Sequence, residues 1–182
     1  ELFSIINFKV SLFSPAKKQL YGSWDNIKFN TPTFCQEVNK LVKLFKTISA
    51  KELIEIMAIS PNLAELNYNR WREFDLNNWG EDNTGPALLS FRGDAYRSLD
   101  APSLSLNELK WANENVYVIS GLYGLLRPLD AIQYYRLEMK TRLPNFSSET
   151  LYKFWGKKLS NHLNKSPVIN LASGEYFKAI KN

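Results

Sequence analysis

The alternation of short apolar runs with segments of helical periodicity constrains the fold more than any other feature. The run "VYVIS" (116–120) is rich in β-branched and aromatic residues, and the helical segment before it begins with Ser105 and Glu108 at capping-box spacing. Further strands are predicted at "FKVSLFS" (8–14), "ALLSF" (87–91), "IQYYRLEM" (132–139) and "PVINLAS" (167–173). Because helices separate these runs, we expect an α/β fold: a single domain, 1–182, with a mixed or mainly parallel sheet flanked by helices.

Two helices are predicted from apolar spacing. Thr33 and Gln36 form a potential capping box before a helix that extends to Ile48. The segment 151–163 carries apolar residues at helical spacing and is predicted as one continuous helix.

Residues 49–74 are predicted to form two helices joined by a short hairpin. Ser49 and Glu52 make a capping box for the first helix, and "SPN" (60–62) interrupts the pattern because Pro61 disfavours a helical residue before it. In the second helix we expect one face to be formed by Leu63, Leu66, Arg70 and Phe74.

Composition limits the possible partners. The 182 residues include 23 Lys and Arg against 18 Asp and Glu, which gives a net charge of +5 and a pI near 9.2 and favours an anionic partner. No apolar run approaches the 18 or more residues of a membrane span, so we expect a soluble protein. Because the chain has one cysteine, Cys35, and one histidine, His162, neither an internal disulfide nor a Cys/His metal cluster is expected. We predict no metal and no cofactor.

Polar clusters follow four of the apolar runs: "SPAKK", "RGDAY", "SGLYG" and "SGEY". Loops at the carboxyl ends of parallel strands line a common crevice, so these clusters predict one charged cleft. Ser14, Lys17 and Lys18 would suit a phosphate or carboxylate, although a solvated pair of lysines on a loop is an equal alternative. Gly93 can adopt positive φ or allow another backbone to come close. The side chains around it, Arg92, Asp94 and Tyr96, form either a ligand site or a turn held by an internal Arg–Asp ion pair.

The stretch "SGLYGLLRPLD" (120–130) is not a nucleotide-binding fingerprint. It is either a glycine turn that leaves a core strand or a nest of N–H groups for an oxyanion, and we favour the turn. In "YYRLEMK" (134–140), Arg136, Glu138 and Lys140 fall on one face of the predicted strand. We expect the turn to place Arg127 and Asp130 beside Arg136 and Glu138.

The hairpin of 49–74 offers a second candidate site. Backbone N–H groups near Ser60 and Asn62 can hold a DNA phosphate, with Lys51, Arg70 and Arg72 adding positive charge. A simple pair of packed helices is the alternative.

The motifs "SPAK", "FRGDAY", "SGLYGLLRPLDAIQYYRLEM", "LYKFWG" and "VINLASGEYF" together resemble the bacterial YaaA peroxide-stress protein family, from about Lys9 to Lys181. The resemblance implies a cytoplasmic DNA-binding protein that protects cells against hydrogen peroxide by limiting free iron and oxidative DNA damage. It also implies a positively charged cleft, carried here onto Lys17, Arg92, Arg127 and Arg136, and a helix-hairpin-helix element within 52–71.

The family typically begins with Met just before the first strand and continues beyond "NLASGEYF", so we expect a fragment that lacks the C-terminal part. The leading hypothesis is binding of double-stranded or distorted DNA with little sequence preference and without catalysis. The alternative is an enzyme that acts on a small anionic or phosphorylated substrate with the strand-end residues Lys17, Asp94, Tyr96, Arg127, Arg136 and Glu138. Direct iron binding is poorly supported by one His and one Cys.

Overall fold

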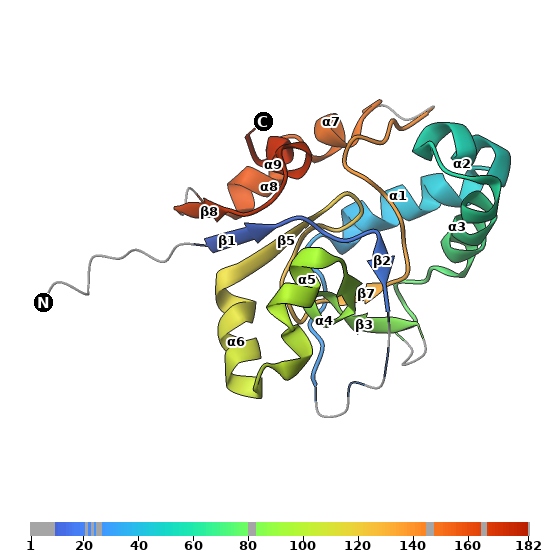
Figure 1. Cartoon of the computed structure of the whole chain (residues 1–182). Coiled ribbons are helices and arrows are strands. Elements are labelled where there is room, and N and C mark those ends of the chain that lie inside the picture. Colours follow the sequence, from blue (N-terminus) through green and yellow to red (C-terminus); the bar gives the residue numbers. More distant parts are fainter. Residues whose placement is uncertain are drawn as a thin grey trace, which may run out of the picture.

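The structure is a computed structural model that describes residues 10–20, 22, 24, 27–79, 83–144, 148–164 and 167–181. The first two residues of the predicted strand 8–14 lie outside these ranges. Figure 1 shows a central sheet with helices on its sides and the α2–α3 pair at one end of the molecule.

A four-stranded sheet forms the centre, in the order β6-β5-β1-β8. Its strands are β1 (Val10–Phe13), β5 (Val116–Ser120), β6 (Gly124–Leu126) and β8 (Val168–Asn170). Strand β1 runs parallel to both β5 and β8, whereas β6 is antiparallel to β5. The predicted α/β fold with a mixed, mainly parallel sheet is therefore confirmed.

Two small antiparallel ladders lie beside this sheet. Strand β2 (Lys18–Gln19) pairs with β4 (Phe91–Arg92), and β3 (Thr84–Pro86) pairs with β7 (Ala131–Gln133). The predicted strand 132–139 was therefore too long, because β3 begins at Thr84, which pairs with Gln133, and the antiparallel ladder ends there after three residues of β7. The strand predicted at 87–91 was also wrong: Ala87–Ser90 forms the short helix α4. All four of its residues are buried, and a fully buried run carries no periodicity that separates a helix from a strand.

The remaining helices surround the sheet and its ladders (Figure 1). They are α1 (Cys35–Thr47), α2 (Ala50–Met57), α3 (Pro61–Glu73), α5 (Asp94–Leu99), a 3₁₀ turn (Ala101–Ser103), α6 (Leu106–Asn115), α7 (Leu151–Trp155), α8 (Lys158–His162) and α9 (Gly174–Lys181). Helices α1 and α3, the longest among the described residues, have 13 residues each, and none of the helices there has the length and apolarity to cross a membrane.

Two of the three predicted capping boxes form. The Ser49 and Ser105 side chains each accept from the N–H three residues on, and Glu52 and Glu108 accept from the serine N–H groups in return. The Thr33–Gln36 box was wrong, since α1 begins at Cys35 behind Phe34, which makes no side-chain cap. The Phe34 ring instead packs against Trp155, 5.5 Å between centroids, so a tertiary contact sets this helix start.

The predicted face of α3 was wrong by about one position. The helix buries Ala64, Asn67 and Trp71, while Leu63 and Leu66 are exposed; of the predicted face, Phe74 at the C-cap is buried as expected. Trp71 stacks on Phe45 of α1 with ring centroids 4.6 Å apart. Burial of the indole removes more apolar surface from water than burial of either leucine, so the helix turns its tryptophan inward.

Two expectations near the C-terminal end also differ. The segment 151–163 is not one helix, because Gly156 adopts φ +48 and separates α7 from α8. Strand β8 was predicted to be buried, yet it forms the edge of the sheet and Ile169 is 44% exposed.

Candidate functional site

The ends of β1 and β8 meet, as expected for parallel neighbours. The Ser173 N–H donates to Ser14 Oγ at 2.8 Å, and Ser14 Oγ lies 3.3 Å from Ser173 Oγ. From α5, the Tyr96 hydroxyl donates to the Ser14 carbonyl at 2.6 Å. The loops after β1, β4 and β8 therefore share one edge of the sheet.

Glu138 joins this edge to the segment that follows β7. Its Oε1 lies 3.1 Å from Lys17 Nζ and 3.1 Å from an Arg136 guanidinium nitrogen, and its Oε2 lies 3.6 Å from Lys140 Nζ. Burial raises the pKa of Glu138, but hydrogen bonds and positive charge from Lys17 and Arg136 outweigh this effect and hold it below its usual value. One ionised carboxylate thus faces three cations, which leaves two positive charges in excess.

The segment 134–143 alternates between buried and less buried side chains. Those that face outward are Tyr134, Arg136, Glu138, Lys140 and Arg142, which we call the outward row. The predicted facing of Arg136 and Glu138 is confirmed. Among the described residues this segment makes only an isolated antiparallel bridge, Arg142 to Thr150, and it turns at Glu138, whose carbonyl accepts from Thr141 N–H. On the α3 side, the Arg70 guanidinium lies 4.9 Å from the centre of the Tyr134 ring.

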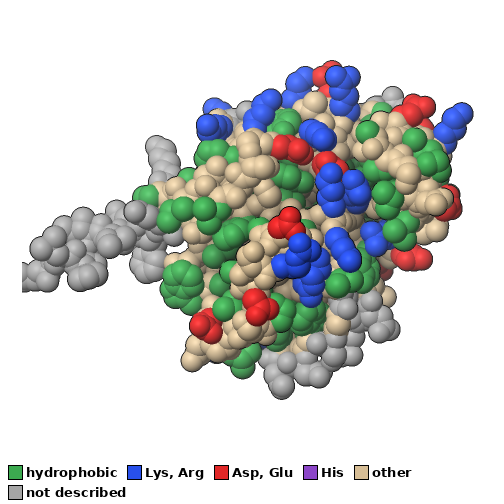
Figure 2. Space-filling model, viewed as in Figure 1, with side chains coloured by type: hydrophobic (Ala, Val, Ile, Leu, Met, Phe, Trp, Pro, Cys, Tyr) green, Lys and Arg blue, Asp and Glu red, His purple; other side chains and the backbone are tan. Residues whose placement is uncertain are grey.

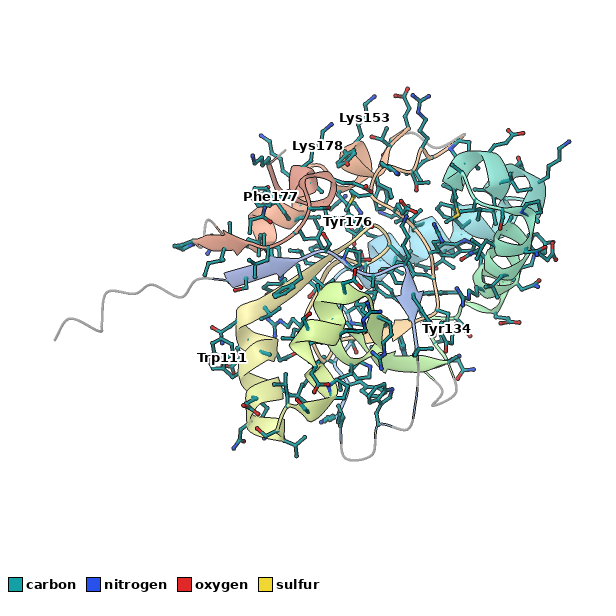
Figure 3. All side chains as sticks on the ribbon, viewed as in Figure 1. Trp111, Tyr134, Lys153, Tyr176, Phe177 and Lys178 are labelled. Carbon is teal, nitrogen blue, oxygen red and sulfur yellow. The ribbon has the colours of Figure 1, made fainter. Side chains whose placement is uncertain are left out.

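Basic side chains gather on this face of the molecule, over the end of β1, β2, α5 and the segment after β7 (Figure 2). Figure 3 places Tyr134 on the side of the α2–α3 pair and Tyr176 above β1. The outward row therefore runs from the helix pair toward the strand ends. It brings Arg70 from one predicted site onto the same surface as Lys17, Arg136 and Glu138 from the other.

The tyrosines of this region are held in their protonated forms. Burial raises the pKa of Tyr96 well above its usual value, with smaller contributions from Tyr135 and Tyr176. Burial is also the main cause of the raised pKa values of Tyr135 and Tyr176. The Tyr96 hydroxyl donates to the Ser14 carbonyl, and Glu138 stays ionised among its cations. Neither group therefore has a pKa near neutrality, as a general base would need.

The contacts around Gly93 differ from the expected internal ion pair. Arg92 donates to the carbonyls of Leu89 and Phe91, at 2.6 and 2.9 Å, and Asp94 pairs with Arg97. The internal Arg92–Asp94 ion pair is therefore wrong. Gly93 has φ 176, an extended conformation that any residue adopts, so of the two alternatives for this glycine the positive φ is not used. Arg92 and Asp94 still line a surface pocket of about 370 Å³ together with Ser14, Lys17 and Tyr96.

Arg127 and Asp130 do not join this edge. Leu126 pairs with Val118 in the antiparallel β5–β6 ladder, so Arg127 lies toward the start of β5. Glu138 lies against Gly121, just beyond the other end of that strand. The placement of Arg127 and Asp130 beside Arg136 and Glu138 was wrong, because β6 reverses the chain direction.

At the start of β5, Asp130 is almost fully buried. Burial raises its pKa to about 7, although the Arg127 backbone N–H, which donates to its Oδ2 at 2.8 Å, and the Arg127 charge act to lower it. Burial, with a contribution from Asp130, also raises the pKa of the Cys35 thiol. His162 has a lowered pKa because of burial and the nearby Arg127. This end of the sheet does not favour a reactive thiolate.

The glycine turn after β5 is a structural feature. Residues 121–124 are all buried, and the carbonyl of Gly121 accepts from Trp155 Nε1 at 3.0 Å. Tyr123 N–H donates to Ser120 Oγ at 3.0 Å, so this N–H already has an acceptor. The favoured interpretation, a turn leaving a core strand, is confirmed over an oxyanion nest.

The two helices expected within 49–74 are present, but their candidate residues separate into two groups. Ser60 caps α3 by accepting from Leu63 N–H, and Pro61 has no N–H to offer, so this helix start presents few donors to a phosphate. Arg70 lies eight residues after Asn62, about 12 Å along the helix. Residues 49–74 also contain three basic and four acidic side chains, a formal charge of −1. The set consists of Lys51, Arg70 and Arg72 against Glu52, Glu55, Glu65 and Glu73.

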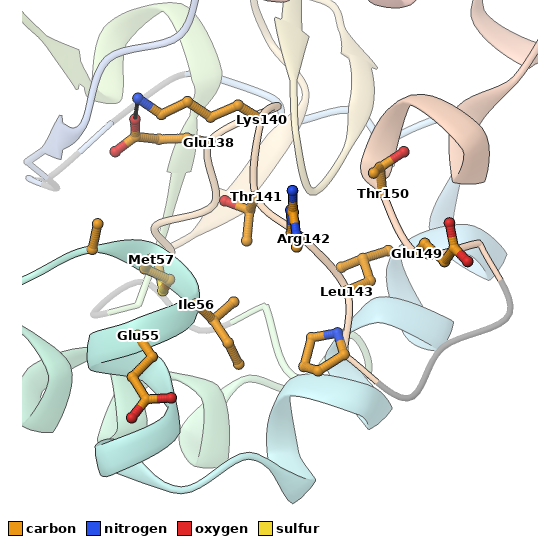
Figure 4. Close-up of a pocket in the computed structure, with 12 residues that line it drawn as sticks. Glu55, Ile56, Met57, Glu138, Lys140, Thr141, Arg142, Leu143, Glu149 and Thr150 are labelled. Atoms are coloured by element: carbon orange, nitrogen blue, oxygen red, sulfur yellow. Dashed lines mark ion pairs between the residues drawn. The ribbon is translucent and has the colours of Figure 1, made fainter.

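Sequence reasoning missed a large pocket beside α2. It has a volume of about 870 Å³ and lies between the end of α2 and the residues 138–144 and 149–150 (Figure 4). Lys140 and Arg142 line it and were not selected as site residues, although the alternation in "YRLEMKTRL" continues through both. Nowhere in the described ranges do three or more His, Cys, Asp or Glu side chains come together as metal ligands.

Comparisons with known proteins agree with these motifs. Residues 10–182 match the protein family described as "Peroxide stress protein YaaA". A UPF0246 protein of Bordetella pertussis is 45% identical over 180 residues, which cover 93% of this chain and 68% of that protein. A UPF0246 protein of Legionella pneumophila is 44% identical over 179 residues, which cover 94% of this chain and 70% of that protein. A UPF0246 protein of Acaryochloris marina is 38% identical over 175 residues, which cover 93% of this chain and 69% of that protein. The chain therefore belongs to the YaaA family of peroxide stress proteins, and this membership supports a role in the response to peroxide.

Proposed function

We propose that this chain protects cells from hydrogen peroxide by binding DNA, double-stranded or distorted, with little dependence on sequence. The observation that carries the proposal is the surplus of positive charge around Glu138. Lys17, Arg136 and Lys140 share that one carboxylate, and Arg142 continues the outward row. A row of cations of this kind suits a strand of phosphates, which carry one negative charge each.

The helix pair α2–α3 has a supporting role in this proposal. Arg70 extends the basic surface at the Tyr134 end of the outward row. The tip at Ser60 and Asn62 belongs to a unit with a formal charge of −1 and adds contacts only through its backbone. Most of the binding free energy then comes from the outward row and Lys17, because phosphate neutralisation by Lys and Arg supplies most non-specific affinity.

As a second part of the proposal, the protein limits free iron, and it does so indirectly rather than by binding iron itself. A complex with DNA lowers oxidative damage by shielding the backbone. Nothing in the arrangement of the described carboxylates, thiol and imidazole supports a direct iron site.

The proposal is tested by fluorescence anisotropy with two labelled duplexes of equal length and unrelated sequence at about 50 mM salt. We expect both duplexes to bind with affinities within about threefold of each other. The control variant is Lys110→Ala on α6. It removes one exposed cation outside the outward row and is expected to leave DNA binding unchanged. The absence of binding to either duplex at low salt would refute the proposal.

A small anionic substrate is the second candidate, favoured by the pocket of about 370 Å³ beside Ser14, Lys17 and Arg92. Its test is calorimetric titration with a phosphomonoester. Saturable binding that Lys17→Ala abolishes, with no binding of DNA, would favour this candidate over the first.

A further inference from the structure

The large pocket beside α2 combines an apolar floor with cations. Ile56 of α2 faces Leu143 across it (Figure 4), and Met57 and Pro144 also line it. Its volume of about 870 Å³ falls within the range typical of small-molecule and cofactor sites, roughly 300 to 1,000 Å³. The pocket is therefore large enough for a ligand with a flat apolar body.

Two exposed cations, Lys140 and Arg142, line the same pocket. Three carboxylates, Glu55, Glu138 and Glu149, are also present, but two of them are paired. Glu138 is shared among its three cations, and Glu149 pairs with Lys153 at 2.6 Å. Close to Lys140 and Arg142, an anionic group therefore meets two carboxylates, Glu138 and Glu149, whose charge is already compensated.

The remaining polar groups favour a ligand that donates and accepts hydrogen bonds. Glu55 supplies acceptor oxygens on the α2 side, and the Thr141 side chain lies on the opposite side. A nucleotide has this combination of parts: a flat base with amino or carbonyl groups on its edge, joined through a sugar to a phosphate. Glutamate is a suitable acceptor for the exocyclic amino group of a base.

We propose that this pocket binds a single unpaired nucleotide, with the base between α2 and Leu143–Pro144 and the phosphate at Lys140 and Arg142. The ligand is either a free mononucleotide or an unpaired nucleotide within a DNA strand. The second case rests on the proposed function, since the pocket shares Glu138 and Lys140 with the DNA-binding surface. Extrusion of a base from a duplex is least costly where it is mismatched or unpaired, so such sites would bind most tightly.

The test uses a duplex with a single bulged 2-aminopurine, the fully matched duplex, and free dAMP. We expect the bulged duplex to bind about tenfold more tightly than the matched one. Ile56→Trp fills the pocket and is expected to reduce this preference to within about twofold, whereas Leu66→Trp, the same change at an exposed position of α3, retains it. The fluorescence of 2-aminopurine reports whether the base changes environment on binding.

Arg142→Ala keeps the test decisive if the tryptophan variant does not fold, because this exposed side chain packs in no core. We expect it to weaken binding of the bulged duplex more than binding of the matched one. Equal affinity for the bulged and matched duplexes, with no binding of dAMP, overturns the inference and leaves the proposed function intact. Binding of dAMP that Ile56→Trp abolishes, with no binding of any duplex, supports the pocket as a free mononucleotide site and overturns the proposed function.

Discussion

Lys17 Nζ lies 3.1 Å from Glu138 Oε1, and this contact joins the loop after β1 to the segment after β7. The Lys17 side chain is 61% exposed, whereas the Glu138 side chain is only 12% exposed. The carboxylate is therefore the fixed member of the pair, around which Lys17, Arg136 and Lys140 are arranged.

Glu138→Gln should destabilise the fold by about 1 to 3 kcal/mol. The amide has the shape of the carboxylate but no charge, so the Arg136 side chain, 17% exposed, loses its ionised partner. The measurement is urea unfolding at pH 7. Glu65→Gln, at an exposed position of α3, is the matched control and should change the free energy of unfolding by less than about 0.5 kcal/mol. Equal effects of the two variants would show that the Glu138 cluster contributes nothing to stability.

Asp130 should make stability decrease as the pH rises. Its pKa in the folded protein is about 7, above the usual 3.8, so folding favours the protonated form. The contribution is fully present below pH 3.8 and is lost as the pH rises toward 7, because the folded state binds the proton more tightly. Asp130→Asn, which stays neutral, should be more stable than the unchanged protein at pH 8 by at least about 1 kcal/mol.

The same comparison at pH 5 should show a smaller difference between Asp130→Asn and the unchanged protein. Thermal or urea unfolding at both pH values measures it. A gap in stability that does not grow with pH would mean that Asp130 is ionised in the folded protein near its usual pKa.

Gly121→Ala should destabilise the protein by about 2 kcal/mol or more. A Cβ at this position would contact the carbonyl oxygen of Leu137, and backbone on both sides cannot move apart without disturbing the Glu138 segment. Gly174→Ala at the start of α9 is the control, because a Cβ there meets nothing within 4 Å. The two melting temperatures measure the contrast, and similar values for both variants would contradict the close packing at Gly121.

The fold class was predictable because the apolar runs and two of the capping boxes are local signals. Ser49 and Ser105 begin helices for reasons contained in four residues each. The start of α1 and the face of α3 were not predictable, since both depend on rings that come from elsewhere in the chain. Phe34 packs against Trp155, and Trp71 packs against Phe45.

The candidate site was predictable where it depends on the alternation of side chains along one segment. It was missed where it depends on the direction in which the chain runs. The spacing of Arg136 and Glu138 was sufficient to place them on one side of their segment. Arg127 was misplaced because β6 pairs back along β5 and carries Arg127 toward the start of that strand. The turn in "SGLYGLLRPLD" was expected, but the pairing that follows it was not. The pocket beside α2 requires the packing of two distant segments, which no local pattern encodes.

The salt dependence of duplex binding tests the central claim most directly. Each phosphate neutralised by Lys or Arg contributes about 0.9 to the negative slope of log affinity against log salt concentration. The double variant Lys17→Ala with Lys140→Ala should therefore show a slope shallower by about 2 than the unchanged protein, while Lys110→Ala retains the full slope. If the double variant bound duplex DNA with the unchanged slope and affinity, the basic surface around Glu138 would not be where the phosphates are held.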